Sequence, residues 1–577
     1  MRKIYTIAAS LLLALGTMAN ASAQSTDFGG TTFNNDIIGW GDLYNLSFTS
    51  HNYGTARSMG MGNAFTAFGG DMISATLNPA GIGMFKDNEV SLTPMMQFSK
   101  SPTTGGDPYY VGVPKRDQEF SDHTERFSMA SIGGVFTAYR GTGALTRFNV
   151  GLVYNRIADF NHNSLNASID NPATESMANI LCTLSNVDGL QTREDGTMPF
   201  GNDPYYWGAV LAYKNGLTNK DAQGWYIDRI TPDAIIDQYS SVETRGGIGE
   251  YDLTFGFNFD GKVLLGASIG MQDVRYRRNV YYGEDYLYRG NDGAIGYASE
   301  VKGGPSGEEY PYQAEYMGYM QRTSISGSGF NFKVGLTVLP VKWLRLGVAY
   351  HTPTYYSLAM RYDSEMWSRT YSAGNNPDGY LVGPKRLMYD DVYSGVWEDA
   401  GAYSWNFRSP SRLLLGVAVV PTDRFIVSVD YERSWYQSTR LQSSPITGLT
   451  TSYKETMKDV FKGGNTVRVG TEVNILPFLP VRLGYIWSGS TLREGYEDII
   501  ATHPIPTQQS IICAGFGLKF TKAIYLDFAY QYSTTKYTSY QTFYAIDSDL
   551  PEMDIESRIF NTKTMRHMAL LTLGFRF

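Results

Sequence analysis

The sequence predicts an all-β protein, a 14-stranded antiparallel transmembrane β-barrel plugged by an N-terminal hatch. Three observations lead to this fold. Apolar and polar residues alternate at period two in many segments, and short turns alternate with long loops between those segments. Beyond the first 23 residues, no apolar run approaches the ~18 to 20 residues that a membrane helix needs. The sequence therefore excludes a helical membrane protein.

Residues 1–23 have the pattern of a secretory signal peptide. A basic Met-Arg-Lys start precedes an apolar stretch from Ile4 to Leu15, and the small residues Ala-Ser-Ala follow at 21–23. We therefore expect export to the periplasm and insertion in a bacterial outer membrane as a multi-pass β-barrel.

The composition fits a large barrel. Aromatic residues make up 14% of the chain, and 61 residues are glycine. The 48 basic and 56 acidic residues are interspersed, so the net charge of −8 comes with no basic patch for nucleic acid. A soluble protein of 577 residues would normally divide into several domains, yet no Pro-rich or Ser-rich linker occurs.

The C-terminal segment has the pattern of a closing strand. Leu571, Leu573, Phe575 and Phe577 share one face, and polar or small residues alternate with them. Because every backbone polar group must be paired in a bilayer, such a strand is stable there only in a closed sheet. The alternative is an edge strand of a soluble sandwich.

The same alternation predicts the other strands. On 247–260, Tyr251, Leu253 and Phe255 face one way, and Asp260-Gly261 forms a tight turn into the next strand. The predicted strands are 88–99, 127–139, 146–160, 247–260, 262–278, 319–339, 342–358, 402–420, 423–437, 461–476, 479–491, 508–521, 523–539 and 560–577.

The connections alternate between short periplasmic turns and long outer loops. The short turns are predicted at 141–145, 260–261, 340–341, 421–422, 477–478 and 522. The long extracellular loops are predicted at about 161–246, 279–318 and 359–401. In the longest loop, helices are predicted to start near Asn171-Pro172 and Thr231-Pro232, because proline suits the first helical turn.

Residues 24–87 are predicted to form a hatch inside the lumen, and residues 88–577 to form the barrel. The first segment is too glycine-rich and irregular to span a membrane, and a fourteen-stranded barrel is wide enough to need filling. A separate periplasmic domain is the alternative.

Two motifs of the predicted hatch carry a resemblance. They are Arg-Ser-Met-Gly-Met-Gly at 57–62, with Ala-Phe at 64–65, and Asn-Pro-Ala-Gly at 78–81. With these motifs, the chain resembles the FadL/TodX family of outer-membrane transporters of hydrophobic compounds, such as long-chain fatty acids and aromatic hydrocarbons. Later hairpins extend the resemblance over about 54–577.

The resemblance implies passive, hatch-gated uptake of a hydrophobic small molecule, with release often sideways through a gap in the wall. In the family this gap arises where a strand kinks near the hatch, and Gly133, Gly134 and Gly151 are the candidates here. No ATP, metal or other cofactor is implied. The alternative function is a protein-binding or secretion scaffold whose enlarged extracellular loops hold a protein partner.

The motifs and the aromatic content select candidate site residues. The hatch or gate residues are Asn78, Pro79, Ala80, Gly81, Gly60 and Gly62. The substrate-binding candidates are Phe65 and Phe68 in the hatch and Tyr205, Tyr206, Trp207, Trp225, Tyr226, Ile235 and Ile236 in the longest loop. The alternatives are plain packing for the loop residues and wedging of the hatch for the two phenylalanines.

Charged residues of both signs occupy inward positions of the predicted strands. They are Glu250, Asp252, Lys333, Arg345, Asp430, Glu432, Arg468, Glu472, Arg482, Asp527 and Arg576. An open porin and a packed, ion-paired interior both fit, and the packed interior is favoured because a hatch backbone needs partners. On the outer side, Arg275, Arg277 and Arg278 with Tyr276, Tyr281, Tyr282, Tyr286 and Tyr288 predict an aromatic girdle with phosphate contacts to lipopolysaccharide.

No enzymatic site is predicted. Ser268 stands in a Gly-x-Ser-x-Gly pattern, but within a predicted strand rather than a strand–turn–helix elbow. The six histidines are scattered without metal-ligand spacing. Cys182 and Cys513 are the only cysteines, and a disulfide or two unlinked thiols both fit.

Overall fold

The computed structural model describes most of the chain. The described residues are 28–31, 46–47, 52–106, 119–187, 189–191, 207–298, 300–301, 313–371, 402–422, 424–443, 454, 457–496, 504–547 and 555–577. The predicted signal peptide and the candidates Tyr205 and Tyr206 lie outside these ranges. None of the described helices has the length and apolar character to cross a membrane.

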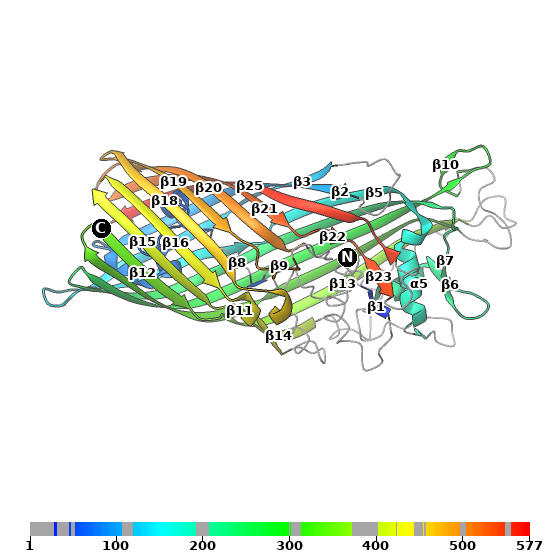
Figure 1. Cartoon of the computed structure of the whole chain (residues 1–577), viewed down its shortest axis with the longest axis horizontal. Helices are drawn as coiled ribbons and strands as arrows, with labels where there is room; N and C mark the ends of the chain where they lie inside the picture. Colours follow the sequence, from blue (N-terminus) through cyan, green and yellow to red (C-terminus); the bar gives the residue numbers. More distant parts are fainter. Residues whose placement is uncertain are drawn as a thin grey trace.

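The wall is a closed antiparallel barrel of 14 strands, as predicted (Figure 1). Its elements are β2 (Glu89–Gly106), β3 (Glu119–Arg140), β4 (Leu145–Asp159), β5 (His162–Pro172), β8 (Ile235–Phe259), β9 (Val263–Arg289), β11 (Gln313–Val341), β12 (Leu344–His351), β13 (Tyr355–Tyr371), β14 (Ala402–Arg408), β15 (Arg412–Thr422), β16 (Phe425–Ser434), β17 (Arg440–Ser443), β18 (Gly464–Leu476), β19 (Leu479–Ser488), β20 (Pro506–Lys519), β21 (Ile524–Tyr537), β22 (Tyr540–Gln541) and β25 (Ile559–Arg576). The short β10 (Ile295–Gly296) pairs with the far end of β9.

Some wall strands are interrupted, so the barrel has more elements than strands. β11 pairs with β12 along one part of its length and with β13 along the other, so β12 and β13 are one wall strand broken at 352–354. β14 and β15 are likewise separated by 409–411. Each break contains a proline, Pro353 or Pro410, which lacks the backbone N–H that a ladder requires.

The barrel closes between its first and last strands. Val90 pairs with Phe575 and Leu92 with Leu573, and the backbone N–H of Asn88 donates to the carbonyl of Phe577. The C-terminus therefore lies at the end of the barrel that carries the short turns (Figure 1). We call this the turn end and the opposite end the loop end.

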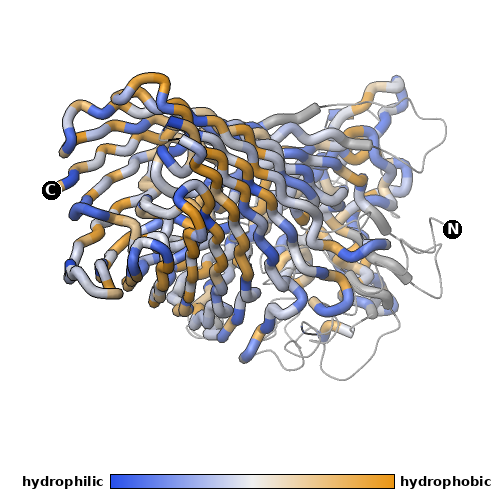
Figure 2. Tube along the Cα trace, turned by 60° about the vertical axis from the view of Figure 1, so that its left-hand side comes forward, coloured by the Kyte–Doolittle hydropathy of each residue, from blue (hydrophilic) through white to orange (hydrophobic). Residues whose placement is uncertain are grey.

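Apolar side chains cover the outer face of the wall over a belt next to the turn end. On β9, Leu265, Ile269 and Met271 are exposed, whereas Ser268 and Gln272 point inward and are buried. Hydrophobic and hydrophilic residues alternate along the barrel strands in Figure 2. This alternation matches a wall with lipid outside and a filled lumen inside.

The strands extend farther toward the loop end than the sequence predicts. β8, β9, β11 and β13 include residues 235–246, 279–289, 313–318 and 359–371, so these parts of the predicted loops are wrong. The neighbouring strands pair continuously there, and each offers the next a ladder of backbone partners.

The helix predictions are partly wrong. After the short turn η2 (Ala173–Glu175), α5 (Met177–Val187) begins five residues beyond Pro172. The second helix is α6 (Trp207–Asn215), whereas Thr231-Pro232 leads into β8. The hairpin of β6 (Thr218–Lys220) and β7 (Tyr226–Asp228) follows α6, and β1 (Phe28–Thr31), β23 (Tyr544–Asp547) and β24 (Ile555–Glu556) form a small sheet. These elements lie toward the loop end (Figure 1).

The predicted girdle is also corrected. Arg278 is buried and points inward, and so are Tyr276, Tyr282, Tyr286 and Tyr288. Arg275 and Arg277 alternate with them and are exposed. Because consecutive strand residues point to opposite faces, the arginines and tyrosines of 275–288 cannot all lie on the outer face of the wall.

Candidate functional site

Residues 52–85 lie inside the barrel, and we call the segment 52–88 the hatch. It contains α3 (Ala56–Gly60), α4 (Ser74–Leu77) and the 3₁₀ turn η1 (Pro79–Met84). Thr55 caps α3, because its hydroxyl accepts a hydrogen bond from Ser58 N at 3.1 Å. Asn78 caps η1 in the same way through Ala80 N, with Pro79 at the first position of the turn.

Asn78 anchors the hatch to itself and to the wall. Its amide nitrogen donates to Thr66 O at 2.6 Å and to Thr337 Oγ1 of β11 at 3.1 Å. A Cβ atom at Gly335 on the same strand would overlap the Asn78 side chain. The predicted Asn-Pro-Ala-Gly element is therefore a docking point for the hatch.

Inward glycines let the hatch backbone approach the wall closely around much of the barrel. We call them the glycine belt, and its members are Gly256, Gly266, Gly335, Gly347, Gly416, Gly470, Gly484 and Gly515. At each of them an added Cβ would meet a hatch atom within 3.4 Å. Several are cross-strand partners, such as Gly256 with Gly266 and Gly470 with Gly484. The glycine belt therefore leaves the space in which the hatch backbone packs directly against the wall.

The predicted hatch glycines serve the same close packing. Gly62 has a φ of 60°, and a Cβ there would lie 3.1 Å from the backbone of both Tyr485 and Val469. A Cβ at Gly60 would lie 3.4 Å from Gly515 Cα of the belt. Gly81 instead packs within the hatch, against Ser74.

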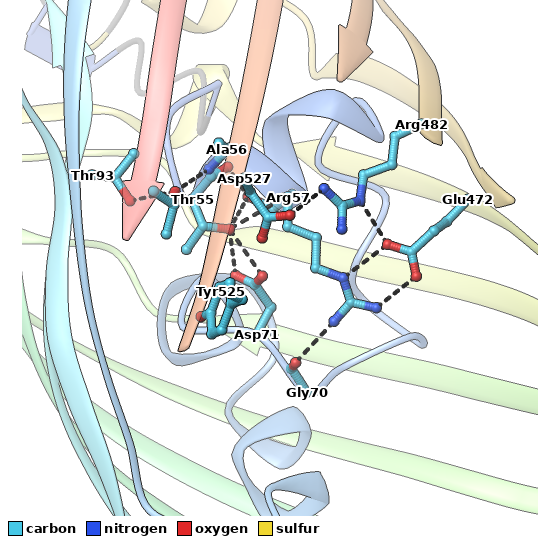
Figure 3. A network of polar contacts seen from close by, with 12 residues as sticks. Thr55, Ala56, Arg57, Gly70, Asp71, Thr93, Glu472, Arg482, Tyr525 and Asp527 are labelled. Carbon is cyan, nitrogen blue, oxygen red and sulfur yellow. Dashed lines mark hydrogen bonds and ion pairs between the residues drawn. The ribbon is translucent and has the colours of Figure 1, made fainter. Parts of the chain in front are cut away.

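Ion pairs bind the hatch to the wall (Figure 3). The Arg57 guanidinium donates two hydrogen bonds of 3.0 Å to the Glu472 carboxylate on β18. Arg482 on β19 donates to the same carboxylate at 2.6 Å and to Asp527 at 2.6 Å. Burial alone would lower the pKa of Arg57, but the adjacent Glu472 carboxylate raises it above its usual value. The interior at this level is packed and ion-paired.

Asp71 is a buried carboxylate within the hatch. The Thr55 hydroxyl lies 2.8 and 2.9 Å from its two carboxylate oxygens (Figure 3). Burial raises the pKa of Asp71 to about 6, although the Arg57 charge opposes that shift. Its ionisation therefore falls close to neutral pH.

Phe65 and Phe68 wedge the hatch in place. Their rings pack edge to face at 5.1 Å, and both are buried against wall residues that include Leu414 and Ile426. The guanidinium of Arg345 stacks on Phe68, also at 5.1 Å. These contacts leave no open face for a ligand on either ring.

A second ionic group holds α4. Lys333 lies between Glu250 at 2.5 Å and Asp252 at 2.7 Å, all three buried. Asp252 accepts a hydrogen bond of 2.8 Å from Thr76 of the hatch, and Asn155 of β4 donates to the same hydroxyl at 2.6 Å. The hydroxyl of Ser268, on β9, donates to the Asp252 carboxylate on β8 at 3.2 Å, so Ser268 belongs to this network.

Toward the loop end, the lumen changes from ionic to apolar. We call the buried apolar group there the lumen cluster, and its members are Leu46, Ile157, Ala158, Phe160, Trp207, Ile248, Val274, Tyr276, Ile325, Tyr356, Leu358, Met360, Tyr362, Trp405, Phe407, Tyr436, Leu441, Met457, Val460, Phe461, Leu492 and Ile505. The transition is visible along single strands, for instance from Asp252 and Glu250 to Ile248 on β8.

The structure separates the loop candidates. Trp207 joins the lumen cluster and its ring lies 5.4 Å from that of Tyr362. Tyr226 is buried elsewhere, donating to Leu190 O at 2.6 Å, while Trp225 is 59% exposed. Ile235 and Ile236 lie on β8 rather than on a helix, and Ile236 packs with α5 and α6.

The wall parts between β3 and β4. Their ladder runs from Arg140–Arg147 to Ser131–Asn155, and beyond that pair the described residues of β3 pair only with β2. β4 and β5 continue along β8 instead, with a register shift after Arg156. The candidate glycines Gly133, Gly134 and Gly151 lie inside the intact ladder, so the parting is not at them.

Polar contacts fix the bend of β4 at the parting. Arg156 forms an ion pair with Asp159 at 2.6 Å, and the Asn161 amide donates to both Asp159 oxygens at 2.9 Å. Arg566 of β25 reaches Asn161 O at 3.5 Å and Tyr53 of the hatch at 3.2 Å. Arg566 therefore contacts both the hatch and the residues that follow β4.

The described residues contain no group of three or more metal-ligating His, Cys, Asp or Glu side chains. Cys182 and Cys513 are both free and buried, so the disulfide considered from the sequence is not formed.

The sequence matches no protein-family model and no curated relative. Several solved structures are similar. A FadL homologue of Pseudomonas aeruginosa is 14% identical, with 92% of this chain and 98% of that chain covered and a TM-score of 0.47. The toluene transporter TodX of Pseudomonas putida is 12% identical, with 91% and 98% covered and a TM-score of 0.43.

A third similar structure is the toluene transporter TbuX of Ralstonia pickettii, at 11% identity, 92% and 100% coverage and a TM-score of 0.40.

Proposed function

We propose that this chain mediates passive, hatch-gated uptake of hydrophobic small molecules across a bacterial outer membrane. The lumen cluster carries the proposal. A porin keeps a polar, water-filled lumen, whereas this lumen holds buried aromatic and aliphatic side chains between the loop end and the hatch. An apolar ligand gains about 0.8 kcal/mol per CH₂ when it leaves water for such surroundings.

The parting of the wall supports a sideways exit for the ligand. Ile157, Ala158 and Phe160, which lie at the bend of β4, belong to the lumen cluster. Phe127 lies on the outer face of β3 beside the parting and is 71% exposed. Apolar side chains thus lie on the inner and the outer face of the wall at the parting, and diffusion down the concentration gradient needs no energy source.

Uptake by intact cells tests this proposal. Cells that produce the protein are expected to take up labelled oleate or toluene faster than cells that lack the gene, and a protonophore should not change the rate. Leu358→Asn, which places an amide in the lumen cluster, should abolish most of the difference. Ile227→Asn on the exposed face of β7 is the matched control and should transport normally.

Equal uptake of both compounds with and without the gene, in cells whose barrel is folded, would contradict the proposal. It would favour a protein-binding scaffold, for which uptake is irrelevant. A wide polar porin would instead show large conductance in planar bilayers, whereas the plugged barrel should conduct weakly.

A further inference from the structure

An outer row of arginines crosses four wall strands above the apolar belt. Arg245 of β8 is the cross-strand partner of Arg277 of β9. Arg277 is the partner of Ser324 of β11, which is in turn the partner of Arg361 of β13. Neighbouring strands are about 5 Å apart, so these side chains form one line on the outer surface. We call them the arginine row.

Two of these cations form no ion pair with the side chains that the structure describes. Neighbouring arginines are neutralised in the pairs Arg245–Glu243 at 2.6 Å, Arg275–Asp273 at 3.2 Å and Arg322–Glu365 at 3.2 Å. Arg277 and Arg361 are exposed and form no ion pair within the described part of the chain. They flank Ser324 at a backbone separation of about 10 Å, a span that two arginine side chains can close around one phosphate.

Small polar residues connect the arginine row to the apolar belt. Ser324, Ser326 and Ser328 follow one another on the outer face of β11, and Ser326 and Ser328 have the small partners Ala359 and Ser357 on β13. Below them the belt begins with Phe330 and Tyr355, whose rings stack at 5.9 Å. A strip of hydroxyl-bearing side chains on β11 therefore leads from Phe330 and Tyr355 to Arg277 and Arg361.

The height of the arginine row selects the ligand. Arg277 lies six residues beyond Met271, the last exposed apolar residue of β9. Six residues cover about 20 Å along a strand, or about 15 Å along the membrane normal at a tilt of about 40°. Phospholipid headgroups add only about 5 to 8 Å to each side of the hydrocarbon core. A phosphate level with the row therefore fits a larger, saccharide headgroup better than a phospholipid headgroup.

We propose that this surface binds lipopolysaccharide, which goes beyond transport. The acyl chains lie along the apolar belt at Phe330 and Tyr355, the sugars contact the serine side chains of β11, and a phosphate sits between Arg277 and Arg361. Planar guanidinium groups bind phosphate oxygens through paired, charge-assisted hydrogen bonds, and both strands are rigid supports.

Binding to the purified full-length protein in detergent tests the proposal. Lipopolysaccharide, enzymatically dephosphorylated lipopolysaccharide and phosphatidylglycerol would be titrated separately and the bound protein counted by native mass spectrometry. The double variant Arg277→Gln/Arg361→Gln is expected to bind intact lipopolysaccharide at least tenfold more weakly than the wild type. Arg424→Gln, an exposed arginine at the turn end, is the matched control and should bind normally.

The arms of the experiment separate the sources of phosphate. Dephosphorylated lipopolysaccharide should bind the wild type as weakly as intact lipopolysaccharide binds the double variant, and phosphatidylglycerol should not distinguish the two proteins. Unchanged affinity of the double variant for intact lipopolysaccharide, with the heat-shifted electrophoretic mobility of a folded barrel retained, overturns the proposal. An equal loss of phosphatidylglycerol binding also overturns it, because the site would then accept any lipid phosphate.

Discussion

The side-chain amide nitrogen of Asn78 lies 2.6 Å from the carbonyl oxygen of Thr66, so one hydrogen bond joins two turns of the hatch. The same amide reaches Thr337 on the wall at 3.1 Å, and its oxygen accepts from Ala80 N at 3.1 Å. Two hatch turns and the barrel therefore meet at a single buried side chain.

Asn78→Ala should loosen the hatch. The change leaves the buried Thr66 carbonyl and Ala80 N–H without these partners, which should cost about 2 kcal/mol of hatch stability. Single-channel recording in planar bilayers should show more frequent opening. Asn219→Ala on the exposed β6 strand is the control, and equal conductance of both variants would contradict the anchoring role.

Gly335→Ala should displace the hatch without unfolding the barrel. The new methyl group would overlap the Asn78 side chain, whereas the backbone pairing of β11 with β9 should stay intact. We expect greater sensitivity of cells to large polar antibiotics. Gly143→Ala is the matched control, because a Cβ at that turn meets no atom within 4 Å. Normal antibiotic exclusion by Gly335→Ala would show that the glycine belt is not needed for docking.

Glu472→Gln should destabilise the hatch more than a surface variant does. It leaves Arg57 and Arg482 without their shared carboxylate, and breaking a buried ion pair costs about 3 kcal/mol or more. Limited proteolysis should then cleave within residues 52–88 at lower protease concentration. Lys262→Ala removes an ion pair that is 71% exposed on both sides, and it should have almost no effect.

Acid should tighten the hatch through Asp71. Its folded pKa of about 6 lies above the ~3.9 of an unfolded aspartate, so its contribution to stability is fully present below about pH 4 and is lost as the pH rises through 6. Conductance should therefore increase between pH 4.5 and pH 7.5. Asp71→Asn should flatten this profile, and an unchanged pH profile in that variant would assign the effect to another group.

The wall was predictable from the sequence because a membrane imposes alternation. Leu265 and Ile269 lie on the outer, lipid-facing side of the wall, and Ser268 between them faces the filled lumen. A short stretch of sequence therefore predicts both that it is a strand and which of its residues face outward. Beyond the membrane that constraint ends. Arg277 and Ser324 face outward there, and only the pairing with neighbouring strands extends β9 and β11.

The candidate site was predictable only in part. Asn78 and Gly62 follow from a short motif whose conformation is local. The lumen cluster was missed because the apolar phase changes face along the wall. In the apolar belt Leu265 and Ile269 face outward, whereas at the loop end Tyr356 and Leu358 face inward, and the alternation alone does not tell which face is the inner one. At the parting, Arg156 donates a hydrogen bond to Gly246 O of β8, which lies 90 residues away in the sequence, and no local pattern predicts this contact.

The hatch runs directly into β2, yet its anchors are far away along the chain. Thr337, Asp430 and Glu472 lie 259, 364 and 415 residues beyond the hatch residues that they hold. During synthesis and insertion, the hatch is made first and finds its partners last, and contacts of such long sequence separation form slowly. We therefore expect a stage of biogenesis in which a nearly complete sheet surrounds an undocked N-terminal segment, before the pairing of Val90 with Phe575 closes the wall.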